Sequence, residues 1–246
     1  MDRMIYTAMS GAKHILEQQA TNSHNLANVN STGFRAQVDS FRAVPVVSEG
    51  LNTRTFVVDA TVGADFSSGP IEHTGRNLDV ALQGQGWISV QRPDGSEAYT
   101  RNGALKVDEN GLLKTASGLT VLGDGGPISI PPDVSITIAS DGTISSVNNT
   151  TLPGPSNIIG RLKLTNPAES SLTRADDGLF VTKDGNPAEA DANVSVVSGA
   201  LEGSNVNVVN AMVNMISLGR QFDMQMKLLQ NAQNNADKAG QIFNLN

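Results

Sequence analysis

The chain has 246 residues, of which 39% are hydrophobic and only 17% are charged, and its formal net charge is −7. This length suffices for one sizeable domain with long appendages, and an acidic chain without clustered Lys and Arg has no general affinity for nucleic acid. The absence of cysteine excludes disulfides, thiolate metal ligands and thiol nucleophiles. No apolar run approaches the ~18 residues of a membrane span, so we expect no direct membrane insertion.

The N-terminal segment carries an apolar stripe at helical spacing. Over residues 1–26, apolar and small polar residues recur at alternating intervals of four and three, which indicates an amphipathic helix. The turn-forming residues at 28–33 predict where this helix ends. The segment also lacks the basic leader and apolar core of a cleaved secretory signal, so we expect export by another route.

The middle of the chain has the pattern of β-structure. Residues 36–73 lack helical periodicity and are interpreted as an extended connector with room for irregular strands. From 74 to 203, short β-runs alternate with turn pairs such as Asp94-Gly95, Asn102-Gly103 and Asp141-Gly142, which predicts an all-β domain. The expected strands are 87–90, 119–122, 134–138, 161–164 and 179–181, and 148–157 is the expected loop.

The C-terminal segment sustains the four-three spacing over about five heptads. Ser204 or Asn205 is expected to cap the start of this helix, and at ~1.5 Å per residue the helix is about 55 Å long. Its seam comprises Val208, Met212, Met215, Gly219, Phe222, Met226, Leu229, Gln233, Ala236, Gly240 and Phe243.

The C-terminal helix is also poor in charge. Residues 204–246 contain fourteen Asn and Gln but five charged residues, and burying an amide costs far less than burying an unpaired charge. This favours a helix surrounded by protein on several sides, with a chance polar face as the alternative. All seven Met lie in the two ends of the chain, and Met224, off the seam, indicates a second contact. We predict an α+β fold in which paired, coiled-coil-like terminal helices flank a central all-β domain.

No catalytic, metal or cofactor site is predicted, and we expect no enzymatic activity. His14, His24 and His73 are scattered along the chain, and Gly84-Gln85-Gly86 lacks the third glycine and the following helix of a dinucleotide loop. One rival hypothesis is a secreted ligand-binding β-domain on a helical stalk. It predicts that the isolated β-domain retains all activity.

Three stretches resemble the bacterial flagellar rod and hook proteins. The run Asn25-Leu26-Ala27-Asn28 through Thr32-Gly33-Phe34-Arg35 is similar to the N-terminal signature of that family. Residues 78–103 resemble its β-core, and 198–227 resemble the start of its C-terminal helix. Within the family the chain looks most like the proximal rod group, with the distal rod protein as the near alternative. Gly219 departs from the pattern, because a better helix former is usual there.

The resemblance implies a structural subunit of the flagellar basal-body rod, which self-assembles through its terminal helices into the periplasm-spanning drive shaft that transmits torque for motility. The implied partners are copies of itself, other rod proteins including the distal rod protein FlgG, and the flagellar type III export apparatus. Residues 1–35 with 204–246 are expected to form the assembly domain, 36–73 the connector and 74–203 the outer β-domain. The expected assembly interface comprises Ile5, Met9, Ala12, Ile15, Leu16, Leu26, Asn28, Phe34, Asn205, Asn207, Met212, Met215, Ile216, Gly219, Phe222, Met224, Met226, Leu229 and Phe243.

Overall fold

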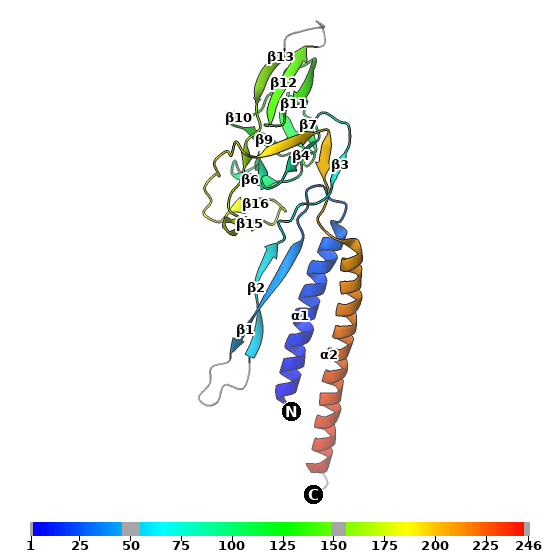
Figure 1. Ribbon diagram of the computed structural model, residues 1–246. Helices are drawn as coiled ribbons and strands as arrows, with labels where there is room; N and C mark the ends of the chain where they lie inside the picture. Colours follow the sequence, from blue (N-terminus) through cyan, green and yellow to red (C-terminus); the bar gives the residue numbers. More distant parts are fainter. Residues whose placement is uncertain (1, 46–54, 149–155, 244–246) are drawn as a thin grey trace. The chain divides into compact units, whose positions relative to one another are not determined.

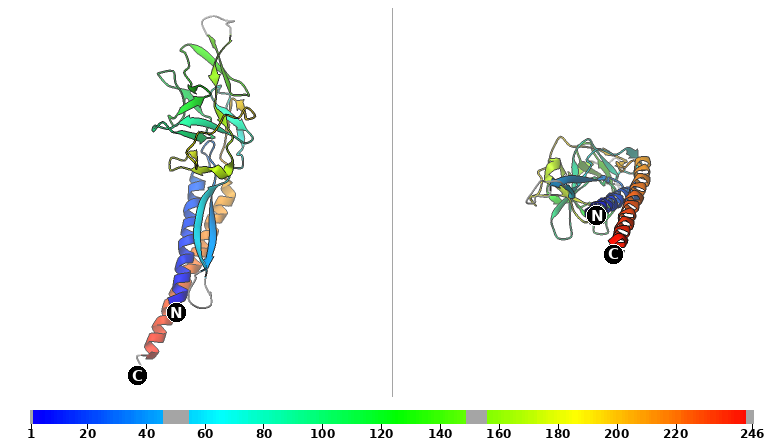
Figure 2. Two further views of the ribbon diagram at one scale, coloured as in Figure 1. Left: turned by 90° about the vertical axis from the view of Figure 1, so that its left-hand side faces the viewer. Right: turned by 90° about the horizontal axis from the view of Figure 1, so that it is seen from below.

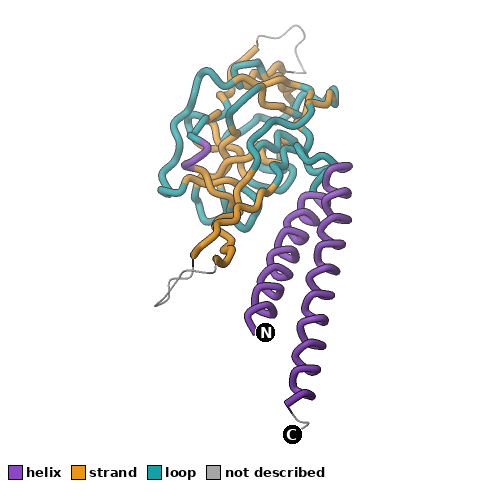
Figure 3. Tube along the Cα trace, turned by 60° about the horizontal axis from the view of Figure 1, so that its bottom comes forward, coloured by secondary structure: helices purple, strands orange, loops and turns teal. Residues whose placement is uncertain are grey.

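The computed structural model describes residues 2–45, 55–148 and 156–243, which form two compact units (Figure 1). The first unit comprises Met1–Asn28, Gln37–Asp65 and Val206–Asn246, and the second comprises Val29–Ala36 and Phe66–Asn205. Long helices lie at the two ends of the chain and strands fill its centre (Figure 3). The predicted α+β class with flanking helices is confirmed.

Two long helices form most of the first unit. Helix α1 spans Asp2–Ala27 and helix α2 spans Val208–Phe243, and they lie side by side in opposite directions (Figures 1 and 2). The amide Nδ2 of Asn22 donates a 2.7 Å hydrogen bond to the carbonyl oxygen of Ala211. Helix α1 has 26 residues and α2 has 36, so α2 extends past the start of α1. Neither helix, over its described residues, is long and apolar enough to cross a membrane.

The predicted cap of α2 is wrong. Asn207 stands directly before the helix, and its Oδ1 accepts a 3.0 Å hydrogen bond from the backbone N–H of Asn210. This contact satisfies one of the unpaired donors of the first turn. Asn205 instead accepts a 2.7 Å hydrogen bond from the N–H of Ala36. Three residues that can cap a helix, Ser204, Asn205 and Asn207, stand within four positions here, and the backbone path decides which of them caps.

Much of the segment interpreted as a connector is a paired hairpin. Strand β1 spans Gln37–Pro45 and β2 spans Thr55–Ala64, and they pair antiparallel from Gln37 opposite Ala64 to Pro45 opposite Thr55. A register shift lies between Ser40 and Phe41. Extended backbone needs partners for its N–H and C=O groups, and each strand supplies them to the other. The hairpin belongs to the same unit as the helices.

The second unit is built from short antiparallel strands. The largest sheet has the order β15-β16-β6-β5-β9-β8-β7, with β10 on β9 and β14 on β5, and smaller sheets are β11-β12-β13, β17-β4 and β18-β3. The strands are β3 (Ile71–His73), β4 (Val80–Gln83), β5 (Trp87–Gln91), β6 (Glu97–Thr100), β7 (Leu105–Val107), β8 (Leu113–Thr115), β9 (Thr120–Gly123), β10 (Gly126–Pro127), β11 (Val134–Ile138), β12 (Thr143–Asn148), β13 (Ser156–Arg161), β14 (Leu164–Thr165), β15 (Leu172–Arg174), β16 (Phe180–Thr182), β17 (Ser195–Ser198) and β18 (Ala200–Glu202), with a 3-10 turn at Glu169–Ser171.

One hydrophobic core holds these sheets together. It contains fully buried side chains from β4, β5, β7, β8, β9 and β12, including Val80, Ile88, Leu105, Leu113 and Ile144. The expected strand 161–164 is wrong, because these residues join the end of β13 to the start of β14. Most of the expected loop, residues 149–155, lies outside the described residues.

The turn pairs behave as predicted with one exception. Gly95 and Gly142 have positive φ angles of 85° and 83°, as tight hairpin turns require. Gly103 is the exception, since its φ is not positive and a Cβ there would lie 1.7 Å from the carbonyl oxygen of Val80. Its glycine is required by the close approach of another strand and not by a turn.

Candidate assembly surface of the terminal helices

The face that joins α1 to α2 is made of small and apolar side chains. Ala8, Ala12 and Ile15 of α1 are buried, as are Ala211 and Ala232 of α2. Small side chains let the helices approach closely, and a Cβ at Gly11 would lie 3.3 Å from the amide of Gln225. The predicted stripe of α1 therefore packs against α2. The interface residues Ile5, Leu26, Met215, Phe222 and Leu229 are half-buried.

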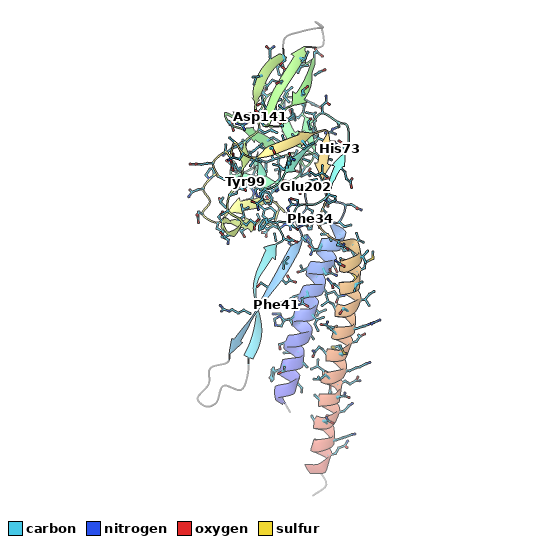
Figure 4. The ribbon with its side chains drawn as sticks, viewed as in Figure 1. Phe34, Phe41, His73, Tyr99, Asp141 and Glu202 are labelled. Carbon is cyan, nitrogen blue, oxygen red and sulfur yellow. The ribbon has the colours of Figure 1, made fainter. Side chains whose placement is uncertain are left out.

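A second face of α1 holds the hairpin by polar contacts. Asn25 donates from Nδ2 to the carbonyl oxygen of Gln37 and accepts the N–H of Gln37 at Oδ1, each at 2.8 Å. The hydroxyl of Thr21 donates to the Asp39 carboxylate at 2.8 Å. About two turns earlier in α1, the ring of His14 meets the ring of Phe41 of β1 edge to face, with 5.5 Å between the ring centres; Phe41 is labelled in Figure 4. The first residue of the Asn25-Leu26-Ala27-Asn28 run thus fixes the register of the hairpin on α1.

The third side of the helix pair exposes apolar side chains to solvent. Tyr6, Met9 and Leu16 of α1 are 50–58% exposed. On α2, Val209, Val213, Ile216 and Met224 are 59–68% exposed, and Met212 and Met226 are about half exposed. Large apolar patches of this kind mark interaction sites on soluble proteins. Helical spacing places Met9 and Leu16 together on one side of α1, whereas the exposed residues of α2 spread over the side that faces away from its buried positions.

A polar cleft of about 400 Å³ lies between α1, the hairpin and α2. Its amides and hydroxyls include Gln18, Asn25, Asn214, Ser217 and Gln221. Amides carry both donors and acceptors, and Asp39, which accepts from Thr21, is the one charged residue in the described part of the chain that lines this cleft. Part of the amide-rich composition of α2 is thus explained by the residues that line this cleft within the first unit.

The second unit holds a buried ionic cluster at Glu202 of β18. Arg35 Nη2 donates to Glu202 Oε1 at 2.8 Å, and Arg101 Nη1 donates to Oε2 at 2.9 Å. The backbone N–H of Gly69 donates to Oε1 at 3.0 Å. The three side chains are at most 3% exposed. Burial lowers the pKa of the Arg101 guanidinium, although the Glu202 carboxylate opposes that shift. The cluster ties together four segments that are distant in sequence.

Two expected interface residues lie in this second unit and already have partners there. Phe34 is buried, and the guanidinium of Arg174 lies 4.6 Å from the centre of its ring (Figure 4). Asn205 Nδ2 donates to the carbonyl oxygen of Ser67 at 3.0 Å. Asn28 Nδ2 donates to the carbonyl oxygen of His24 at 2.9 Å, and Asn207 caps α2. All four residues make contacts within their own chain, and their contact with neighbouring subunits stays a prediction.

Sequence reasoning missed part of the exposed face. Tyr6, Val209 and Val213 were not predicted as interface residues, because they lie off the predicted four-three stripes. The predicted seam of α2 is itself only partly covered: Met215, Phe222 and Leu229 are half-buried, whereas Met212 and Met226 are about half exposed. The signal was available, since Val209, Val213 and Ile216 repeat the four-three spacing one position off that seam. Phe243 is the last residue of α2, and its side chain lies outside the described part of the chain. Among the described residues, no cluster of three His, Asp or Glu suits a metal ion.

Comparison with known proteins identifies the family. Family models match three parts of the chain: "Flagella basal body rod protein" at residues 5–35, "Flagellar hook protein FlgE/F/G D1 domain" at 81–146 and "Flagellar basal body rod FlgEFG protein C-terminal" at 197–242. Two full-length relatives are named flagellar basal-body rod protein FlgF. The one from Escherichia coli is 48% identical and the one from Salmonella typhimurium 46%, each over the whole of both chains.

Relatives named FlgG are more distant. The one from Buchnera aphidicola subsp. Schizaphis graminum is 30% identical over 89% of this chain and 92% of its own length. The distal rod alternative is therefore the weaker one. By its full-length similarity to the FlgF relatives, the chain belongs to the family of flagellar basal-body rod proteins and is a structural subunit of the proximal rod.

Proposed function

We propose that this subunit enters the rod by burying the exposed apolar faces of α1 and α2 against copies of itself and against other rod proteins, including FlgG. The observation that carries the proposal is the set of large apolar side chains left in solvent on both helices, most of them more than half exposed. Fully burying one such side chain stabilises an interface by about 1.5–3 kcal/mol before ordering costs. Several of them per subunit suffice for cooperative assembly.

The expected interface residues divide into two roles under this proposal. Buried and half-buried members such as Ala12, Ile15 and Phe222 hold α1 and α2 together in a coiled-coil-like pair. Exposed members contact neighbouring subunits; these are Met9, Leu16, Met212, Ile216, Met224 and Met226. Methionine suits such contacts, because its flexible side chain adapts to neighbours at slightly different angles.

Membership in the rod family supports a wider role. We infer that the subunit is exported through the flagellar type III apparatus without a cleaved signal, that it stands in the periplasm-spanning part of the basal body, and that it transmits torque mechanically. Residues 1–35 and 204–246 supply the assembly helices, 36–73 supply the hairpin that packs with these helices and the link to the β-domain, and 74–203 form the outer β-domain. The protein carries out no catalysis and needs no cofactor.

A charge placed on the exposed face tests the proposal. Ile216 is 59% exposed, so Ile216→Asp leaves the free chain folded but places a carboxylate where a neighbour packs. Asn235→Asp is the matched control, because Asn235 is also exposed on α2 but lies seven residues beyond Leu228, the last exposed large apolar side chain among the described residues of the helix. We expect Ile216→Asp to lower the amount of the protein in purified basal bodies at least tenfold, equivalent to about 1.4 kcal/mol, and to abolish swimming.

The control separates assembly from folding. Both variants are expected to keep the circular dichroism and the Trp87 fluorescence of the unmodified chain. Normal incorporation of a folded Ile216→Asp variant would show that this face of α2 is not an assembly surface.

A further inference from the structure

No contact within the described part of the chain explains why α2 has a glycine at position 219. An interior helical glycine costs about 1 kcal/mol relative to alanine. A Cβ at Gly219 would meet no atom within 4 Å, whereas a Cβ at Gly11 of α1 would lie 3.3 Å from Gln225. Close packing of α1 against α2 therefore accounts for Gly11 and does not account for Gly219.

Several apolar side chains near Gly219 on α2 reach solvent, although Asp223, one turn later, is charged and exposed. Met212 and Met226 stand seven residues before and after it, and they are 51% and 47% exposed. Ile216, one turn earlier, is 59% exposed. Residues at these spacings lie on one face of a helix. Gly219 is therefore the floor of a notch between two exposed methionines and an isoleucine.

The same chain offers a second uncovered helical face that matches this notch. Met9 and Leu16 of α1 are also seven residues apart and about half exposed. A symmetric contact that pairs α1 with α1, or α2 with α2, covers one of these two faces and leaves the other exposed. A contact between α2 of one copy and α1 of the next covers both. Repeated head to tail, such a contact forms a ring or, where the rotation does not close, an open helical assembly.

We propose that the notch at Gly219 receives an apolar side chain from the Met9–Leu16 face of α1 in a second copy, so that the two helices approach more closely than any larger residue would permit. The exposed face adjoins the half-buried Met215 and Phe222, which lie between Ala211 and Gln225, two residues that approach α1 of the same chain. The new contact therefore continues the existing helix packing. This inference rests on the proposed function and names the partner of its surface.

Replacement of Gly219 by alanine has opposite effects on the free and the assembled protein. In the free chain the added methyl group meets open space and favours the helix, so helix content and Tm rise. In the assembly the methyl group fills the notch, and overpacking costs about 1–3 kcal/mol. Incorporation into basal bodies should then fall by about fivefold to a hundredfold.

Gly240→Ala is the matched control. Gly240 also lies in α2, and a Cβ there also meets nothing within 4 Å. We expect both variants to keep or raise the Tm of the monomer, and Gly219→Ala alone to lose incorporation and swimming. Normal incorporation of Gly219→Ala, or an equal loss in Gly240→Ala, overturns the notch. If the notch is overturned in this way but Ile216→Asp still fails to assemble, the proposed function stands without the notch.

Cross-linking identifies the occupant. The chain has no cysteine, so Leu16→Cys and Ile216→Cys, carried by two differently tagged copies in one cell, report only contacts between copies. We expect a disulfide-linked dimer that carries both tags, and none when Asn235→Cys replaces Ile216→Cys. Absence of the mixed dimer in basal bodies that contain both copies, or a cross-link only to a different protein, overturns the assignment to a second copy.

Discussion

Removal of the negative charge at Glu202 should destabilise the second unit strongly. Glu202 is 1% exposed and accepts hydrogen bonds from Arg35, Arg101 and Gly69. The variant Glu202→Gln keeps the size of the side chain but leaves two buried guanidinium groups without a counter-charge. The new amide also turns an N–H donor toward groups that can only donate.

The magnitude follows from burial. Breaking a buried ion pair by removing one partner costs about 3–5 kcal/mol, because the remaining charge is no longer compensated. That is a large share of the roughly 5–15 kcal/mol that stabilises a typical domain. At about 2–4 °C per kcal/mol for a domain of this size, Tm should fall by roughly 6–20 °C.

The assay has a built-in probe. Trp87 is the sole tryptophan, and the Arg101 guanidinium lies 5.5 Å from the centre of its ring. Urea and thermal unfolding followed by Trp87 fluorescence therefore report on this unit. Glu72→Gln is the control, because Glu72 is exposed on β3 opposite Leu201 of β18. If Glu202→Gln unfolds within about 2 °C of Glu72→Gln, the ion cluster does not stabilise the unit.

Three further predictions concern local features. Asn207→Ala removes the cap of α2 and should cost about 1 kcal/mol in urea unfolding followed by circular dichroism; an unchanged midpoint would contradict the cap. Gly33 has a φ angle of +67°, and the Cβ of Gly33→Ala would lie 2.4 Å from the backbone of Arg101. We therefore expect the free energy of unfolding, followed by Trp87 fluorescence, to fall by more than ~2 kcal/mol. Side-chain hydrogen bonds lower the pKa of Asp94, Asp108 and Asp141. The stabilisation that these carboxylates contribute is present above about pH 4 and is lost as pH falls through their lowered folded-state pKa values. The urea midpoint should therefore decline in acid, and it should decline less when all three residues are replaced by Asn.

Local patterns predicted the helices and many turns well. The four-three spacing of Ala8, Ala12 and Ile15 identified the face of α1 that is buried, because side chains three and four residues apart meet on a helix surface whatever the rest of the fold does. The Asp-Gly pairs at 94–95 and 141–142 marked hairpin turns for a similarly local reason. The pair at 102–103 was predicted as a turn for the same reason, but Gly103 is required because Val80, a residue of another strand, approaches it closely.

The apolar face that points to solvent was only half predictable. Met9, Leu16, Met212 and Ile216 were expected at an interface, and all are exposed. Periodicity shows that a helix has apolar residues on several sides, but it does not show which side its own chain covers. That choice depended on where α1 and the hairpin pack.

By itself, the sequence determined the two terminal helices, the β-rich centre between them and the family resemblance, because each depends on residues that are close together along the chain. The tertiary structure alone decided that β1 and β2 pair on α1 through Asn25, and that Arg35, Arg101 and Glu202 meet. Arg35 and Glu202 are 167 residues apart. No periodic pattern spans such a separation, and their contact exists because folding removes all three charged groups from water together.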